Sequence, residues 1–145
     1  MSVELPFAPV DSIIRRHADG LRVSADATTE LAGRIQFHGA QLAVNAAERA
    51  NRDGRKTLMA EDFDVHEPPA KNDLTLPIAP VDRIARLEIE NRYLVSMDAR
   101  VALASVLETY ADDVAAGAVI LARHADRRTI TDRDVETYFQ LVSPE

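Results

Sequence analysis

Two stretches of the chain carry apolar residues at the spacing of a long amphipathic helix. In the second half, intervals of four and three, the period of an α-helix, separate Leu103, Leu107, Tyr110, Val114, Gly117 and Leu121. In the first half the same spacing gives Leu31, Ile35, His38 and Leu42, followed by the polar residues Asn45 and Arg49. Ser24 and Ser96 precede the two stretches, and serine is a favoured N-cap residue. We therefore predict long helices from these serines to about Arg52 and Ala125, each roughly 40 Å long.

Shorter helical patterns flank each long stretch. Pro9 and Pro80 each suit the first position of a helix and predict a short helix that opens there. Thr131, with Asp134 three residues later, resembles a capping box and predicts a third helix in the second half. The matching helix of the first half should be short and end near His66, because two prolines follow. The predicted organisation is two short–long–short units at 1–67 and 76–145, joined by a linker at 68–75.

The two units are copies of one another. "LPFAPVDSII" (5–14) matches "LPIAPVDRIA" (76–85) at seven of ten positions, "VSADA" (23–27) matches "VSMDA" (95–99), and "GRKTL" (54–58) corresponds to "DRRTI" (126–130). The offset is 71 residues in the first block and 72 in the later blocks, which indicates a tandem duplication. A unit of this size with one long helix cannot enclose a core by itself. We expect the two units to bury their apolar faces against each other.

Composition excludes several classes of function. Apolar residues make up 46% of the 145 residues, so the chain should fold, and it lacks an apolar run long enough for a membrane helix or a signal peptide. These features predict a soluble, cytoplasmic protein without a membrane partner. Cysteine is absent and the four histidines are scattered, which argues against disulfides and metal sites. Because no nucleophile–base pair or glycine-rich phosphate loop is present, we expect no enzyme activity, no cofactor and no small-molecule substrate.

The charge balance points in two directions. Asp and Glu total 24 against 17 Lys and Arg, a net charge of −7, and only Lys56 and Lys71 are lysines. An Asp-rich, Lys-poor surface favours adaptation to very high salt, although an ordinary acidic protein is the alternative. Taken alone, the negative charge argues against a nucleic-acid partner. In multimolar salt, however, the Debye length is about 3 Å or less, so only groups that touch DNA would matter. The same salt would weaken DNA binding.

Several motifs in both units resemble those of archaeal histones. They are "ELPFAPVDSII", "RVSADA" and "GRKTLMAED" in the first unit, and "LPIAPVDRI" and "LARHADRRTI" in the second. The resemblance implies an all-α chain of two tandem histone folds that cross their long helices in an intramolecular handshake, with each first loop beside the other fold's second loop. It also implies a chromatin protein of the nucleoid. Such a protein binds the phosphates and minor groove of double-stranded DNA with low sequence specificity.

The resemblance further implies roles for individual residues. In the second loops, contact with DNA falls to Lys56, Thr57, Arg128 and Thr129. The first-loop arginine corresponds to Arg22, but Leu94 stands at that position in the second fold, where Arg92 would face the same way if the loop is extended. The first-helix arginine of the family corresponds to Arg83 in the second fold. In the first fold Ser12 stands at that position. Arg15 and Arg86 lie nearby. Bracing pairs are expected between Arg55 and Asp62 and between Arg127 and Asp134.

The alternative for each of these residues is that it has only a structural role or is an ordinary solvated surface residue. An isolated surface arginine is usually only solvated, and an Arg–Asp pair at the end of a loop is usually structural. The duplicated register favours the DNA-binding interpretation for Arg22, Lys56, Thr57, Arg83, Arg128 and Thr129.

The two folds differ at the ends of their long helices. By resemblance, Leu121, His124 and Asp134 form a surface through which the second fold self-associates. The first fold has Arg49 and Arg52 in place of the first two, so one adhesive end per molecule is predicted. Alternatively, Leu121 and His124 only complete the core and the protein is monomeric.

Two other functions remain open at the level of sequence. One is a histone-fold scaffold that binds proteins such as transcription machinery and contacts DNA only incidentally. The other is a transcriptional regulator that binds DNA at selected loci.

Overall fold

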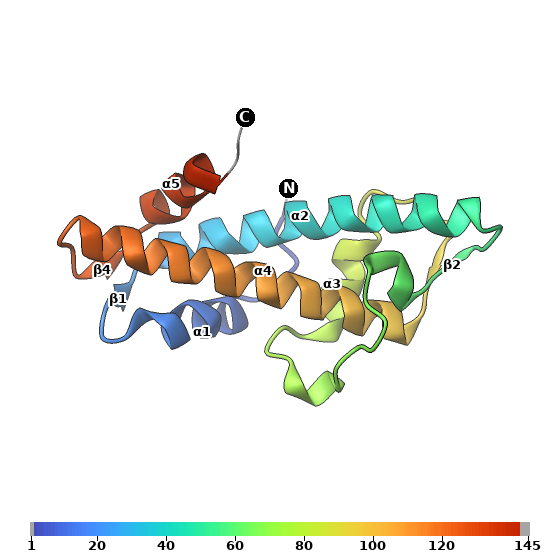
Figure 1. The fold of residues 1–145 in the computed structure, drawn as a ribbon, viewed down its shortest axis with the longest axis horizontal. Coiled ribbons are helices and arrows are strands. Elements are labelled where there is room, and N and C mark those ends of the chain that lie inside the picture. Colours follow the sequence, from blue (N-terminus) through green and yellow to red (C-terminus); the bar gives the residue numbers. More distant parts are fainter. Residues whose placement is uncertain (1, 143–145) are drawn as a thin grey trace.

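The two predicted long helices run past each other and form the centre of the molecule (Figure 1). The structure is a computed structural model that describes residues 2–142. The first fold contains α1 (Phe7–Ala18), β1 (Arg22–Val23), α2 (Ala25–Arg52), β2 (Thr57–Leu58) and the 3₁₀ helix η1 (Ala60–Phe63). After the 3₁₀ helix η2 (Lys71–Asp73), the second fold contains α3 (Ile78–Ala85), β3 (Leu94–Val95), α4 (Met97–His124), β4 (Thr129–Ile130) and α5 (Asp132–Val142). None of the described helices is both long and apolar enough to cross a membrane.

The starts of both long helices are confirmed and have the same physical cause. Ser24 Oγ accepts a hydrogen bond from Ala27 N at 3.0 Å, and Ser96 Oγ accepts one from Ala99 N at 3.0 Å. Each bond satisfies a backbone N–H that has no partner within the helix. The N-cap serines therefore fix where the two helices begin.

The short first helices begin two residues earlier than predicted. Helix α1 starts at Phe7 and α3 at Ile78, so Pro9 and Pro80 are the third residue of each helix rather than the first. Proline is accepted there because the N–H groups of the first turn have no hydrogen-bond partner within the helix. Proline has no N–H, so no helical hydrogen bond is lost.

The third helix of the first fold is shorter than predicted. Only the single turn η1 forms, and it ends at Asp64, whose φ of 62° is left-handed. In the second fold, Thr131 N donates to Asp134 Oδ2 at 2.8 Å and α5 continues for 11 residues. The difference follows the sequence, because α5 brings Tyr138 and Phe139 against the core, whereas the first fold continues with polar residues and prolines.

Two short parallel strand pairs join the folds at opposite ends. Strand β1 pairs with β4, with Arg22 opposite Thr129, and β2 pairs with β3, with Thr57 opposite Leu94. Each pair joins the first loop of one fold to the second loop of the other, as expected for a handshake. The all-α architecture of two tandem histone folds is confirmed.

The core is shared, and alanine supplies much of the buried face of both long helices. The end of α2 was expected to turn polar at Asn45 and Arg49, but its buried face there consists of Ala43, Ala46, Ala47 and Ala50. On α4, Leu103, Leu107 and Val114 are buried as predicted. Alanine allows two helix backbones to approach closely, whereas larger side chains fill the space beneath them. The short helices add large buried side chains to this core, through Ile13, Ile14, Val81 and Ile84.

Candidate nucleic-acid interface

The candidate interface consists of two loop pairs, one at each end of the molecule. The β1–β4 loop pair comprises residues 19–24 and 126–131, and the β2–β3 loop pair comprises residues 55–59 and 91–96. In the β1–β4 loop pair, Arg22 N donates to Arg128 O at 2.8 Å. In the β2–β3 loop pair, Leu94 N donates to Lys56 O at 2.8 Å. The backbone pairing therefore holds the predicted loop residues of both folds side by side.

Both second loops are held by the same pairing of an arginine with a buried aspartate. Arg55 Nη1 donates to Asp62 Oδ2 and to Thr57 O, both at 2.9 Å. Arg127 Nη1 donates to Asp134 Oδ2 at 2.8 Å and to Thr129 O at 3.2 Å. A second contact joins Arg127 Nη2 to Asp134 Oδ1. Each arginine thus ties the backbone of its threonine to a carboxylate on the following helix.

The two aspartates are ionised despite their burial. Burial alone would raise the pKa of Asp62, but hydrogen bonds from Arg55 and from Met59 N lower it below its usual value. The pKa of Asp134 is lowered in the same way, against the effect of burial, by Arg127 and Thr131 N. The bonds to the aspartates in turn raise the pKa of Arg55 and Arg127. The braces are therefore charged, and they hold the backbone at Thr57 and Thr129 in place.

Next to the braces, three predicted cations are exposed without a partner. Within residues 2–142, no hydrogen bond or ion pair engages the side chain of Arg22, Lys56 or Arg128. Six Lys and Arg side chains of residues 2–142 have no hydrogen-bond or ion-pair partner: Arg22, Arg52, Lys56, Lys71, Arg128 and Arg133. The other arginines of residues 2–142 contact carboxylates, so the unpaired cations are the ones most available to an external anion, and three of them lie at the loop pairs.

The first-helix arginines are in a different electrostatic situation. Arg83 Nε donates to Glu4 at 2.9 Å, Arg15 Nε to Asp11 at 2.6 Å, and Arg86 Nε to Asp82 at 3.1 Å. Exposed ion pairs of this kind are worth about 0–1 kcal/mol, so DNA could compete for these arginines at a small cost. The structure thus separates the predicted cations into free ones on the loops and paired ones on α1 and α3.

The β2–β3 loop pair lacks the equivalent of Arg22. Leu94 occupies the same register as Arg22 and is 60% exposed. The extended loop assumed for Arg92 is wrong, because residues 91 and 92 form a turn closed by Tyr93 N and Glu90 O. The guanidinium of Arg92 lies 4.4 Å from the centre of the Tyr93 ring and donates to the Tyr93 hydroxyl at 2.8 Å. Arg92 is therefore held against its own loop.

Sequence patterns missed three cations near the loop pairs. Arg123 Nη2 donates to Asp19 O at 3.1 Å and to Ala18 O at 3.3 Å, so it caps the end of α1 from the other fold. No local pattern could have found this contact, because it joins residues more than 100 positions apart. Arg52 and Arg133 are exposed at the end of α2 and the start of α5, without counterparts of the same charge in the repeat.

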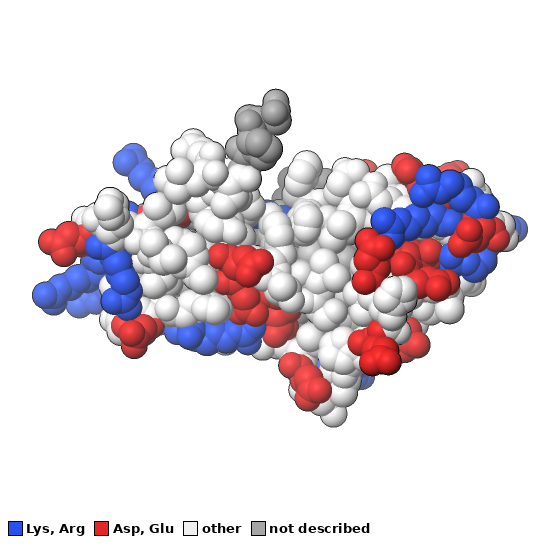
Figure 2. All heavy atoms as spheres, in the orientation of Figure 1, with Lys and Arg blue, Asp and Glu red and all other residues white. Residues whose placement is uncertain are grey.

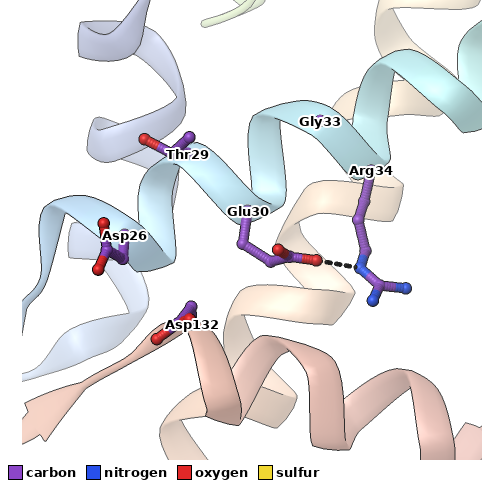
Figure 3. Close-up of a pocket in the computed structure, with 6 residues that line it drawn as sticks. All are labelled: Asp26, Thr29, Glu30, Gly33, Arg34 and Asp132. Atoms are coloured by element: carbon purple, nitrogen blue, oxygen red, sulfur yellow. Dashed lines mark hydrogen bonds and ion pairs between the residues drawn. The ribbon is translucent and has the colours of Figure 1, made fainter.

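A hollow beside the β1–β4 loop pair is acidic and does not suit phosphate. It measures about 280 Å³ and is lined by Asp26, Thr29, Glu30, Gly33, Arg34 and Asp132. Figure 3 shows three carboxylates around the hollow. Glu30 accepts a hydrogen bond at 2.7 Å from Arg34, the one cation among the residues that line the hollow. No group of three or more His, Asp or Glu side chains among residues 2–142 could hold a metal ion. An anion would therefore be repelled from this hollow and directed towards the loops.

Charged side chains are unevenly distributed on the face drawn in Figure 2. Lys and Arg gather at the end that carries β1 and β4, with few acidic side chains among them. At the end that carries β2, acidic and basic side chains are mixed. On this face, the end that carries β1 and β4 is thus the more positive of the two.

The residues proposed for self-association lie at the same end as the β1–β4 loop pair. Leu121 is half-buried, and His124 is exposed, so His124 does not complete the core. Asp134 is 2% exposed and already accepts from Arg127. At the other end, Arg49 Nη1 donates to Asp64 at 2.7 Å, and Arg52 is exposed.

Known proteins share this arrangement of helices and loop pairs. A family model for histone-like transcription factors (CBF/NF-Y) and archaeal histones matches residues 3–65 and 74–137. The two matches cover most of the chain, which therefore belongs to this family. It is accordingly a histone-like, DNA-binding, chromosome-associated protein.

The proteins that are similar to the chain include one curated relative and two solved structures. A subunit of the archaeal histone HAN1 from Thermococcus zilligii is 50% identical over 60 residues, which are 41% of this chain and 87% of the relative. The histone from Methanopyrus kandleri has a TM-score of 0.72 and 24% identity, with 97% of both chains covered. A protein from Thermus thermophilus has a TM-score of 0.70 and 17% identity, with 96% of this chain and 99% of that chain covered. At these identities the two structures show a shared fold alone.

Proposed function

We propose that the protein is a cytoplasmic, nucleoid-associated chromatin protein that binds duplex DNA with low sequence specificity through its two loop pairs. The observation that carries this proposal is the presence of unpartnered cations beside braced threonines, at Arg22 and Arg128 with Thr129, and at Lys56 with Thr57. Cations and hydroxyl groups bind phosphate oxygens, and phosphate contacts position a protein on DNA without reading its sequence. Arginine can also enter the minor groove, where base pairs are poorly distinguished.

The weaker first-helix patch has a secondary role in this proposal. Arg15, Arg83 and Arg86 would contact DNA between the two loop pairs after exchanging a carboxylate partner for a phosphate. Since these ion pairs are exposed, the exchange costs little. Arg92 would need to leave both Tyr93 and Glu90, so it contributes least.

Binding to unrelated duplexes tests the proposal. Fluorescence anisotropy at one salt concentration should give dissociation constants that agree within a few fold for duplexes of different sequence. Each constant should increase steeply with salt, because counterion release drives phosphate binding. Undetectable binding at every salt concentration would contradict the proposal.

A regulator that binds selected loci is the second candidate. It is favoured by the acidic surface and by the loss of one first-loop arginine at Leu94, which together leave fewer phosphate contacts than a fully duplicated site. A strong preference for one duplex over others at equal salt would support this candidate instead.

We further propose that two chains associate through the second fold alone. A contact between two copies of the first fold would have to bury Arg52, which has no partner, together with the Arg49–Asp64 ion pair, whereas Leu121 and His124 carry no such penalty. One self-complementary end gives a closed two-fold dimer. Light scattering in multimolar salt, with and without DNA, should show at most two chains. Leu121→Glu should return the protein to one chain, and the control Arg49→Glu should not. Filaments on DNA would contradict this assembly.

The proposed adaptation to high salt predicts unfolding at low salt. With a net charge of −7, carboxylates repel one another when the screening length increases on dilution. Circular dichroism at 222 nm should show helix content falling as potassium chloride is lowered from multimolar to about 0.01 M, where the Debye length is about 30 Å. If the midpoint of thermal unfolding, followed by the same signal, does not change over this range of salt, the protein is an ordinary acidic protein.

A further inference from the structure

An ion network joins α1 of the first fold to α4 of the second. Arg16 Nε donates to Asp112 Oδ1 at 3.0 Å, and Arg16 Nη2 donates to Asp112 Oδ2 at 2.9 Å and to Glu108 Oε2 at 3.1 Å. His17 Nε2 lies 2.8 Å from Asp112 Oδ1. In Figure 2, acidic side chains over the middle of α4 reach down to basic side chains over α1. The charges that meet between the folds in this network are therefore complementary.

The network also holds the segment that leads into the second fold. Glu108 Oε1 accepts from Thr75 N at 2.7 Å and from Leu76 N at 3.0 Å. Arg16 Nη1 donates to the Thr75 hydroxyl at 2.9 Å. The side chain of Glu108 is only 11% exposed, so its charge requires these donors. Burial disfavours the charge on Arg16, but its bonds to Asp112 and Glu108 outweigh that effect and raise its pKa.

The internal repeat provides a comparison for each member of the network. At the offset of 72 residues, Glu108 corresponds to Gln36 and Asp112 to Ala40. Gln36 Oε1 accepts from Glu4 N at 2.7 Å, so the backbone contact is repeated without the charge. Arg16 and His17 correspond to the stretch 87–89, which reads Leu-Glu-Ile. The first fold thus carries only the basic half of the network, and the second fold carries only the acidic half.

We propose that this network determines which folds pair, so that a first fold selects a second fold rather than another copy of itself. Two first folds would place Arg16 against Gln36 and Ala40, without a carboxylate. Two second folds would bring Glu88 towards Glu108 and Asp112, where like charges repel. Only the mixed pair satisfies every charge, and matching of this kind discriminates by penalising the wrong partners.

Because the protein has no cysteine, introduced thiols can report the pairing in the full-length chain. Residues 22 and 57 pair with different strands at opposite ends of the molecule, so Arg22→Cys/Thr57→Cys cannot form a disulfide within one chain. In a pair of two first folds, position 22 of one chain would lie beside position 57 of the other. Neighbouring strands are about 4.8 Å apart, within disulfide range. Thr57→Cys/Leu94→Cys is the positive control, because it reports the mixed pair within one chain.

In the Arg22→Cys/Thr57→Cys protein, refolded under mild oxidation, disulfide-linked dimers should be rare on a non-reducing gel. Adding Arg16→Glu should increase them about tenfold, the ratio that corresponds to about 1.4 kcal/mol. The matched control Arg15→Glu should leave them unchanged, because Arg15 pairs with Asp11 of its own helix. Adding Asp112→Arg to Arg16→Glu should restore the low level of dimers.

Two results would overturn the proposal. One is an equal dimer level in the Arg16→Glu and Arg15→Glu proteins. The other is an Arg16→Glu protein that is unfolded by circular dichroism and is not restored by Asp112→Arg, because the network would then serve stability without selecting a partner by charge.

Discussion

Neither residues 1–70 nor residues 71–145 should fold alone as a monomer. Helix α1 packs against α4, and α3 packs against α2, so the short helices of each fold cover the long helix of the other. Ile13, Ile84 and Leu107 are fully buried in the whole chain, and separation would expose side chains of this kind on both halves. Each such side chain contributes about 1.5–3 kcal/mol when buried. The loss of several is comparable with the whole free energy of unfolding of a domain, about 5–15 kcal/mol.

Circular dichroism and light scattering of the two halves in multimolar salt measure this effect. Each half should have low helix content or should self-associate, and mixing the two halves should recover helix content. The uncut chain in the same buffer is the control and should unfold cooperatively on heating. Two well-folded monomeric halves would be incompatible with a shared core.

Removing the cations of the β1–β4 loop pair should weaken DNA binding more than any other change of equal charge. We expect Arg22→Ala/Arg128→Ala/Thr129→Ala to bind unrelated duplexes more weakly by the same factor, since phosphate contacts do not depend on sequence. The slope of log affinity against log salt should fall by about two, one for each cation lost. Lys56→Ala/Thr57→Ala should reduce this slope by about one, because the β2–β3 loop pair has one unpartnered cation.

The matched control is Lys71→Glu, which changes the charge by the same two units at an exposed residue outside both loop pairs. It should bind almost as the parent does at each salt concentration. If the loop variant and this control lose affinity equally, binding depends on total charge, and the loop pairs have no special role.

The repeat and the helix caps made most of the fold predictable from the sequence. Ser24 and Ser96 act through atoms three residues away, and the apolar spacing is local, so both features are visible in a single segment. The repeated loop motifs, read through the family resemblance, also predicted that the loops would pair across the folds. The extent of the third helix in the first fold was not predictable to the residue, because it depends on whether later side chains reach the core.

Residues of the candidate site that recur in both folds were predictable from the repeat, whereas Arg22, which does not recur, was predictable only through the family resemblance. Lys56 and Arg128 were found because their loops are copies of each other. The turn at Arg92 was not, because it lies between Ile84 and Val95, where the offset between the repeats changes from 71 to 72 residues. The engagement of Arg83 by Glu4 and the network of Arg16 involve residues 79 and 96 positions apart, so no sequence window contains both partners.

Site-specific photo-crosslinking tests most directly whether the loop pairs form the DNA-binding face. Because the chain has no cysteine, one introduced thiol can carry a photoreactive group in Arg128→Cys, Lys56→Cys or Gln41→Cys. Gln41 is exposed on α2, away from both loop pairs, and serves as the reference position. With duplex DNA of arbitrary sequence, positions 128 and 56 should crosslink strongly and position 41 only at background level. Crosslinking that is equal at the three positions, or strongest at 41, would show that DNA does not lie across the loop pairs.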